Sequence, residues 1–221
     1  MNQTPANEEL VAGVLDIIYR HPRHRELYYK ALAFCAQERT VDEAEDYLEA
    51  QPEFASALQA STTLINVLIE EGGLAYREYD AQGTAITEES LAAAREAGVT
   101  EDELYEQVAR RTVRTTSAGN AAVALLDPAK RVSSYVLSVP ERTHVYRKLL
   151  QFCTTPRALD EIKALIDGDP ALEPTARTSW QKLHAVHFID RMDEAGGLVW
   201  NNGWVTTEAG RAFLDSVDDT K

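Results

Sequence analysis

Two segments of this chain, 118 residues apart, have similar sequences. Glu26–Phe54 reads ELYYKALAFCAQERTVDEAEDYLEAQPEF, and His144–Leu172 reads HVYRKLLQFCTTPRALDEIKALIDGDPAL. Identical residues at this offset include Tyr28/Tyr146, Lys30/Lys148, Leu32/Leu150, Phe34/Phe152, Cys35/Cys153, Asp42/Asp160, Glu43/Glu161 and Pro52/Pro170. The period is too long and the copies are too few for a solenoid, so the repeat indicates a duplicated domain.

The similarity continues beyond these segments, with a change of offset. The triplets Gly72-Gly73-Leu74 and Gly196-Gly197-Leu198 match at an offset of 124, which places a six-residue insertion in the second copy around the sequence EPTART. The pairs Thr87-Glu88 and Thr207-Glu208 match at an offset of 120. We therefore expect hairpins of different length, each followed by a last helix that Thr87 or Thr207 caps.

Each copy has the residue pattern of three helices followed by a hairpin. A helix with an apolar stripe is followed by a short helix with acidic residues in its first turn, and a longer third helix ends at the Gly-Gly pair. The Asn-Gly at 202–203 between aromatic and β-branched residues is typical of a tight hairpin. The predicted fold is mainly α with small β-hairpins (α+β), in two winged helix-turn-helix domains.

The end of the second copy, GLVWNNGWVTTEAGRAFL, resembles the winged-helix domains of bacterial and archaeal transcriptional regulators. The residues that carry this resemblance are Val205, Thr206, Gly210, Arg211 and Leu214. The first copy, read as Ile86-Thr87-Glu88-Glu89-Ser90, has Ser where the pattern has Gly. The resemblance implies the fold of both copies, and it implies a regulator that associates with DNA.

The predicted domains follow from these boundaries. The first repeat with a leading helix covers residues 1–98, a helical linker covers 99–118, and the second repeat with its own leading helix covers 119–221. The linker is expected to be helical because TEDELYEQVARRTVR has a helical period after an N-capping Thr100. Pro22 and Pro140 match at an offset of 118, which places one leading helix before each repeat.

The net charge of −14 is unevenly distributed. Residues 24–98 carry 15 acidic and 5 basic side chains, whereas residues 141–221 carry 13 and 10. Affinity for nucleic acid comes mainly from cations at phosphates, so only the second half is a candidate for DNA binding. The longest apolar runs are too short to cross a bilayer, and the first residues lack the pattern of a secretory signal. We expect a cytoplasmic protein without a membrane partner.

A helical wheel of the third helix of the second copy gathers polar side chains on one side. Trp180, His184, His187 and Arg191 lie opposite a core side, and Asn201 and Asn202 lie on the wing. These residue types contact bases and phosphates in DNA. The candidate DNA-binding residues are Arg177, Gln181, Lys182, His184, His187, Arg191, Asn201 and Asn202. The alternative is a solvated helix face with Trp180 packed beneath the wing or against the other domain.

The matching face of the first copy has a different character. Ser56, Ala60, Thr63 and Val67 occupy these positions, and none of them is charged. Such a face suits close packing against a protein partner, a second copy of the chain or the second repeat. The competing functional hypothesis is therefore an acidic tandem winged-helix module that binds protein and not DNA. Tandem winged helices of this kind include the acidic subunits of bacterial chromosome-condensation complexes, which this chain resembles in architecture and charge.

The sequence contains no motif of a catalytic or cofactor-binding site. It lacks a phosphate-binding Gly-rich loop, a nucleophile elbow and an HExxH motif, so we expect neither enzymatic activity nor a cofactor. His184 and His187, with Asp190, could approach a metal ion, but no further ligand is placed beside them. Cys35 and Cys153 are expected to be buried small hydrophobic residues and not a disulfide pair.

Overall fold

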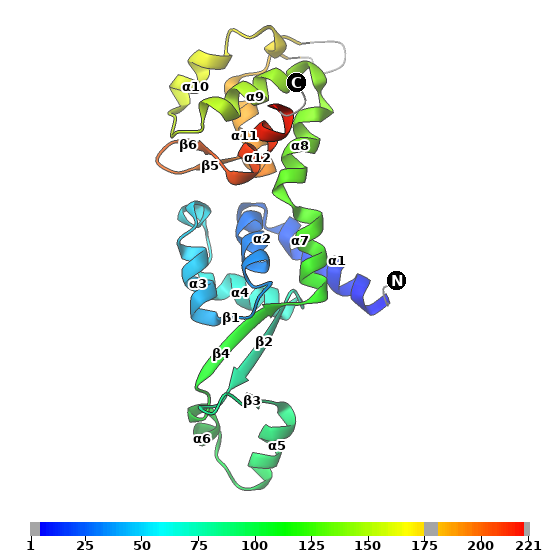
Figure 1. Cartoon of the computed structure of the whole chain (residues 1–221), viewed down its shortest axis with the longest axis vertical. Coiled ribbons are helices and arrows are strands. Elements are labelled where there is room, and N and C mark those ends of the chain that lie inside the picture. Colours follow the sequence, from blue (N-terminus) through cyan, green and yellow to red (C-terminus); the bar gives the residue numbers. More distant parts are fainter. Residues whose placement is uncertain (1–4, 175–180, 219–221) are drawn as a thin grey trace. The chain divides into compact units, whose positions relative to one another are not determined.

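The chain forms two compact units, Met1–Leu125 and Leu126–Lys221. This computed structural model describes residues 5–174 and 181–218 (Figure 1). Both units are mainly helical, and each contains a small antiparallel sheet. The expected α+β composition, helices with small β-hairpins, is confirmed.

The first unit contains five helices around its core and a four-stranded sheet with the order β1-β4-β2-β3. Its elements are α1 (Pro5–Arg20), η1 (Pro22–His24), α2 (Arg25–Phe34), β1 (Arg39–Thr40), α3 (Val41–Glu49), η2 (Pro52–Ser56), α4 (Ser61–Glu70), β2 (Leu74–Tyr79), β3 (Ala85–Ile86), α5 (Glu88–Glu96), α6 (Glu101–Glu106), β4 (Arg110–Thr115) and α7 (Ser117–Leu126). Helices α5 and α6 lie apart from the core, beyond the far ends of β2 and β4 (Figure 1).

The second unit contains helices that pack around one hydrophobic core and a two-stranded sheet. Its elements are α8 (Pro128–Ser138), η3 (Pro140–Arg142), α9 (Thr143–Phe152), α10 (Leu159–Ile166), η4 (Pro170–Leu172), α11 (Ala185–Ala195), β5 (Leu198–Trp200), β6 (Trp204–Thr206) and α12 (Glu208–Asp218). Phe188, Ile189 and Met192 of α11 are buried against Tyr146 and Leu149 of α9.

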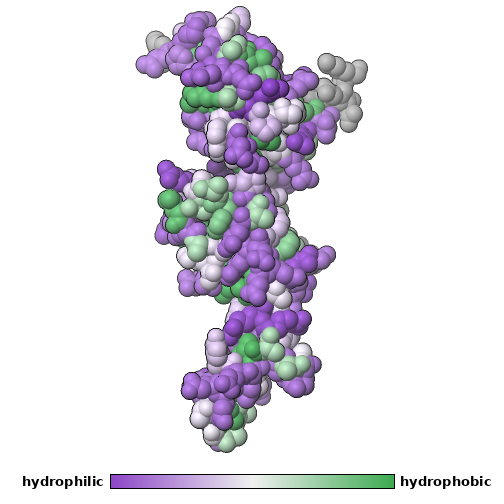
Figure 2. Space-filling model, turned by 90° about the vertical axis from the view of Figure 1, so that its left-hand side faces the viewer, coloured by the Kyte–Doolittle hydropathy of each residue, from purple (hydrophilic) through white to green (hydrophobic). Residues whose placement is uncertain are grey.

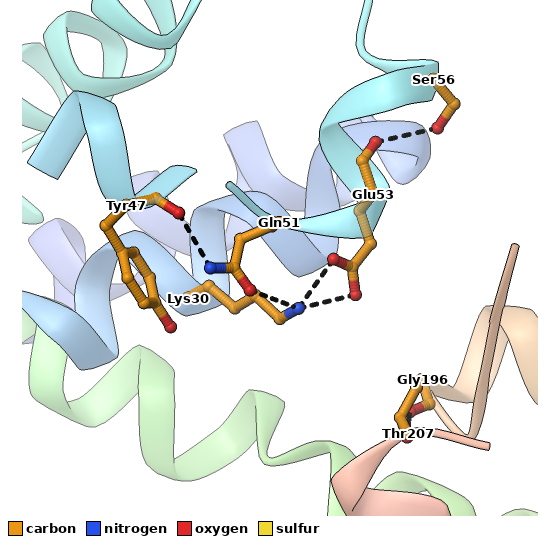
Figure 3. A network of polar contacts seen from close by, with 7 residues as sticks. All are labelled: Lys30, Tyr47, Gln51, Glu53, Ser56, Gly196 and Thr207. Atoms are coloured by element: carbon orange, nitrogen blue, oxygen red, sulfur yellow. Dashed lines mark hydrogen bonds and ion pairs between the residues drawn. The ribbon is translucent and has the colours of Figure 1, made fainter. Parts of the chain in front are cut away.

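A threonine pair closes the hairpin of each unit onto its helices. In the second unit, the Thr206 hydroxyl donates to the Leu150 carbonyl oxygen at 2.5 Å, and the Thr207 hydroxyl donates to Gly196 at 2.6 Å (Figure 3). In the first unit, the corresponding bonds join Thr115 to Leu32 and Thr116 to Gly72, each at 2.6 Å. We call these pairs the threonine anchors.

A glycine follows each anchor because the helix backbone passes close to the Gly-Gly turn. A Cβ atom on Gly119 would lie 2.2 Å from the carbonyl oxygen of Gly73. A Cβ atom on Gly210 would lie 2.5 Å from that of Gly197. Both contacts are shorter than any side chain tolerates, so the sequences Thr-Thr-x-Ala-Gly at 115–119 and 206–210 meet the same steric requirement in the two units.

Further contacts recur just before α3 in the first unit and just before α10 in the second unit. Arg39 stacks on the Phe34 ring at 4.8 Å and pairs across the sheet with Val113. Arg157 stacks on the Phe152 ring at 4.3 Å and forms a β-bridge with Trp204. The capping glutamates Glu43 and Glu161 then accept the backbone N–H of Thr40 and Ala158.

The match between Thr87 and Thr207 that the sequence predicts is wrong. Thr87 caps α5 by accepting the N–H of Ser90, far from the Gly-Gly turn. In the first unit, the residue that makes the bond equivalent to that of Thr207 is Thr116, which lies 29 residues after Thr87. Both threonines precede a helix and have the same local N-cap signature, so only the long-range bond to Gly72 distinguishes them.

Residues 99–118 belong to the first unit and do not form the predicted helical linker. Helix α6 ends at Glu106, and β4 then pairs with β2 over six residues, from Leu74↔Thr115 to Tyr79↔Arg110. The hairpin of the first unit therefore runs from β2 to β4, and residues 80–109 are an insertion between its strands. The boundary between the units lies after Leu125 instead of at residues 99–118.

Candidate partner-binding surfaces

The third helix of the second unit begins later than its sequence pattern predicts. The N–H of Leu183 donates to the Leu172 carbonyl oxygen at 2.8 Å, and helix α11 starts only at Ala185, with His184 as its N-cap residue. Gln181 and Lys182 are exposed but precede the helix, so they do not share its outer face. Arg177 and Trp180 lie outside the described residues.

The basic side chains of this surface are paired with carboxylates. Lys182 forms an ion pair with Glu173 at 2.5 Å, and Arg191, which is half-buried, forms one with Glu194 at 2.5 Å. The remaining exposed side chains of α11 are those of Val186, Asp190, Asp193 and Glu194. The outer face of α11 is therefore acidic and not basic.

One of the two histidines, His187, contributes little positive charge at neutral pH. His184 is exposed, and His187 is half-buried with its ring edge-on to Phe188 at 5.5 Å. Burial lowers the pKa of His187, and the nearby Arg191 and Arg142 lower it further. An imidazole with a pKa below its ordinary value of 6.5 is neutral at pH 7.

The β5–β6 hairpin of the second unit, which the sequence predicts as a wing, is uncharged and aromatic at its tip. Asn201 and Asn202 are exposed, as predicted, and Asn202 adopts a left-handed conformation with φ of 51°. Trp200 is 53% exposed, and its ring meets that of Trp204 edge-on at 5.6 Å. The structure brings Asn201 and Asn202 together with these tryptophans and not with a cluster of cations.

The matching surface of the first unit is continuous and uncharged. Ser56, Ala60 and Thr63 are exposed and Val67 is half-buried, although only Thr63 and Val67 lie within α4. Leu58 between them is 72% exposed, and no residue from 54 to 69 is charged. Figure 2 shows hydrophobic side chains on the helical part of the first unit, between hydrophilic neighbours.

A half-buried polar network holds the segment that leads to this surface. The Lys30 ammonium donates to Gln51 at 3.0 Å and to Glu53 at 2.7 Å, and the Gln51 amide donates to the Tyr47 carbonyl oxygen (Figure 3). Ser56 then donates to the carbonyl oxygen of Glu53. These bonds hold η2 against α2 and α3, so the chain presents residues 56–60 in a defined conformation.

Sequence reasoning missed a third surface, the arginines of β2 and β4. Arg110 and Arg114 are exposed on a strand that the sequence pattern assigns to a helical linker. Two signals in the sequence indicate the strand: the alternation in RRTVRT and the identity of TTSAG at 115–119 with TTEAG at 206–210 at all but one position.

Among residues 5–174 and 181–218, no helix is both long and apolar enough to cross a bilayer. Over the same residues, no three His, Cys, Asp or Glu side chains are grouped as metal ligands would be. Cys35 and Cys153 are both buried and unpaired, as expected, and burial raises the pKa of each thiol to about 11.

Comparison with protein-family models, with curated proteins and with solved structures gave no match.

Proposed function

We propose that the chain is a tandem winged helix-turn-helix protein whose third helices bind protein and not DNA. The duplicated fold is supported by the threonine anchors, by the arginine-on-phenylalanine contacts and by the helix order that the two units share. In this fold the third helix and the wing are the surfaces offered to a partner.

The charge of the two third helices carries the proposal about the partner. Helix α4 contains neither lysine nor arginine, and α11 contains one arginine and no lysine; this residue, Arg191, is paired with Glu194. A surface that binds the DNA backbone releases counterions through unpaired cations, and these helices present none among their described residues. An uncharged face with an exposed leucine instead resembles the centre of a protein–protein interface.

DNA association through the second unit is the competing function. It would rest on His184, Asn201 and Asn202, which are exposed and able to hydrogen-bond base edges. It would also require Arg191 to leave Glu194, and it would bring Asp190 and Asp193 close to phosphates. The acidic outer face of α11 therefore disfavours this function relative to protein binding.

A photo-crosslinking experiment tests the proposal. A benzophenone amino acid is placed at Thr63 in the full chain, in its native host, and a matched control carries it at exposed Asp102 in the insertion. We expect a discrete protein adduct from position 63 and none from position 102. The Leu58→Asp substitution should abolish the adduct from position 63, because it places a charge at the centre of the uncharged face.

Two results would overturn the proposal. One is the absence of any adduct at position 63. The other is salt-sensitive binding of a 20-base-pair duplex to the purified chain that the Arg191→Ala substitution weakens, because that result assigns the third-helix surface to DNA. A self-adduct at position 63, with a dimer in sedimentation, identifies the protein partner as a second copy of the chain.

A further inference from the structure

Strands β2 and β4 are the two central strands of the four-stranded sheet of the first unit; we call this pair the ribbon, and its two faces differ. Side chains alternate between the faces of a strand, and paired residues share a face. Tyr76, Glu78, Val113 and Arg111 therefore occupy one face. The opposite face carries Arg77, Tyr79, Arg110, Thr112 and Arg114, and we call it the arginine face. The second unit, with strands of three residues, has no counterpart to the outer part of this ribbon.

Two arginines of this face have no carboxylate partner. Arg110 stacks on the Tyr79 ring at 4.6 Å, and neither Arg110 nor Arg114 forms an ion pair within residues 5–174 and 181–218. Arg77 lies 3.9 Å from Glu38, which also accepts the Tyr79 hydroxyl at 3.2 Å. Asp42 lines a cavity of about 420 Å³ together with Arg110. The arginine face thus retains an excess of positive charge in a strongly acidic unit.

The acidic insertion of the same chain lies beyond the outer ends of β2 and β4, and one of its helices contacts the face opposite the arginine face (Figure 1). Residues 80–109 contain eight acidic side chains and one basic side chain, Arg95, which pairs with Glu101. Helix α6 contacts the ribbon through Tyr105, whose ring lies 5.0 Å from the Arg111 guanidinium. Because Arg111 and Arg110 point to opposite faces, this contact of α6 lies on the face opposite the arginine face.

The position of the insertion favours a short anionic ligand over a duplex. Arg110 and Arg114 are separated by about 14 Å along β4, from a rise of roughly 3.4 Å for each of four residues. A DNA duplex carries a charge every ~1.7 Å of its axis and is stiff over this length, so it would extend past Arg110 towards the carboxylates of the insertion. A flexible acidic segment can occupy only the arginine face. In an extended segment, acidic residues at alternate positions recur every ~7 Å on one side.

We propose that the arginine face binds an acidic segment of a protein partner, with Arg110 and Arg114 as the principal contacts and Arg77 between them. This proposal rests on the proposed function, because it assumes that the chain binds protein, and it adds a second surface with opposite charge preference to the uncharged α4 face. Arginine and tyrosine are enriched at the energetic centres of such interfaces. The stacked Arg110–Tyr79 pair presents both to a partner.

Fluorescence polarisation on the full chain tests the proposal with three labelled probes. They are a twelve-residue peptide of alternating Glu and Ser, the same peptide with Gln in place of Glu, and a 20-base-pair duplex. We expect the Glu peptide to bind at low salt and to weaken as salt increases, and the Gln peptide and the duplex not to bind. Arg110→Glu/Arg114→Glu should weaken binding of the Glu peptide by roughly tenfold or more.

A matched variant controls for net charge. Arg20→Glu/Arg23→Glu makes the same change of charge on α1 and η1 of the first unit, and it should alter the affinity by less than about twofold. Circular dichroism melts verify that both variants fold. The proposal is overturned if the Glu peptide does not bind, if both variants weaken it equally, or if the duplex binds and only the ribbon variant loses it. Self-association that the ribbon variant abolishes also overturns it, since the occupant is then a second copy.

The two proposals fail separately. A crosslink at Thr63 that persists while the Glu peptide fails to bind removes only the assignment of the arginine face. Loss of the crosslink, with peptide binding intact, leaves an anion-binding ribbon on a chain whose third helices do not bind protein.

Discussion

The two units close their hairpins with the same contacts, but they place different lengths of chain between the strands. In the second unit three residues, Asn201–Gly203, separate β5 from β6. In the first unit 30 residues separate Tyr79 from Arg110, and they include two helices. The anchors must therefore be set by residues that lie before and after the hairpin, while the hairpin itself is free to change. The two units therefore share the anchor contacts while they expose different surfaces.

The glycines after the anchors should give the largest effects. Gly119→Ala forces a Cβ to within 2.2 Å of a backbone oxygen, and Gly210→Ala to within 2.5 Å. We expect each to cost about 3 kcal/mol of unfolding free energy, more than the roughly 1 kcal/mol that alanine gains over glycine in a helix. Because all three tryptophans belong to the second unit, urea unfolding followed by tryptophan fluorescence should detect Gly210→Ala, and circular dichroism is needed for Gly119→Ala.

Gly168→Ala provides the control for these substitutions, because a Cβ there meets nothing within 4 Å. Its effect should stay within about 0.5 kcal/mol. An unchanged circular dichroism transition for Gly119→Ala would show that the first unit does not depend on the close approach seen at Gly73, and the equivalence of the two anchors would then be lost.

The threonines rank next, and they test which residue of the first unit corresponds to Thr207. Thr116→Ala removes a bond to the Gly72 carbonyl oxygen that ties α7 to the turn after α4, and we expect a cost of about 1–2 kcal/mol. Thr87→Ala removes only an exposed cap of α5 and should cost about 1 kcal/mol or less, confined to the insertion. Chemical denaturation of both variants measures the difference. Equal losses in global stability would contradict the assignment of Thr116.

The sequence predicted the helices, their order within each repeat and the buried cysteines, because these depend on local apolar spacing and on short capping patterns. It misplaced the end of the first hairpin, because the N-cap signatures of Thr87 and Thr116 are locally the same and only the contact with Gly72 separates them. The helical period of residues 100–114 was misleading for the same reason, since pairing with β2 overrides local propensity from Arg110 onward.

The candidate site was predicted less well than the fold. A helical wheel drawn through residues 180–191 assumes that all of them are helical. The Leu183 N–H instead donates to the Leu172 carbonyl oxygen, and the helix begins only at Ala185. Nor does a wheel show ion pairs: the partner of Lys182 is Glu173, nine residues earlier and across a bend in the chain. Charge on a surface depends on such neighbours, and they are fixed only by the folded backbone.

The buried cysteines give a pH-dependent test that should be similar in the two units. Burial raises the pKa of Cys35 and Cys153 from 9.0 to about 11, so the folded chain holds these protons when the unfolded chain has released them. Stability from the thiols is complete below pH 9 and is lost as pH rises to about 11. Unfolding free energies at pH 8, 9, 10 and 11 should therefore decline less steeply for Cys35→Ala/Cys153→Ala than for the wild type. Parallel declines would mean that the thiols titrate normally in the folded chain.

Removal of the whole insertion, residues 80–109, is expected to have only a small effect on stability. Tyr79 and Arg110 are paired residues, so a two-residue Asn-Gly turn can join them in place of residues 80–109. Of the residues removed, only Leu104 is buried, and it lies in the insertion and not in the helical core. We expect the shortened chain to unfold cooperatively with a free energy within about 1 kcal/mol of the wild type. A chain that no longer folds would show that the insertion supports the first unit. A chain that folds would have a first hairpin as short as that of the second unit, and the anchors would then be sufficient to hold the hairpin in both units.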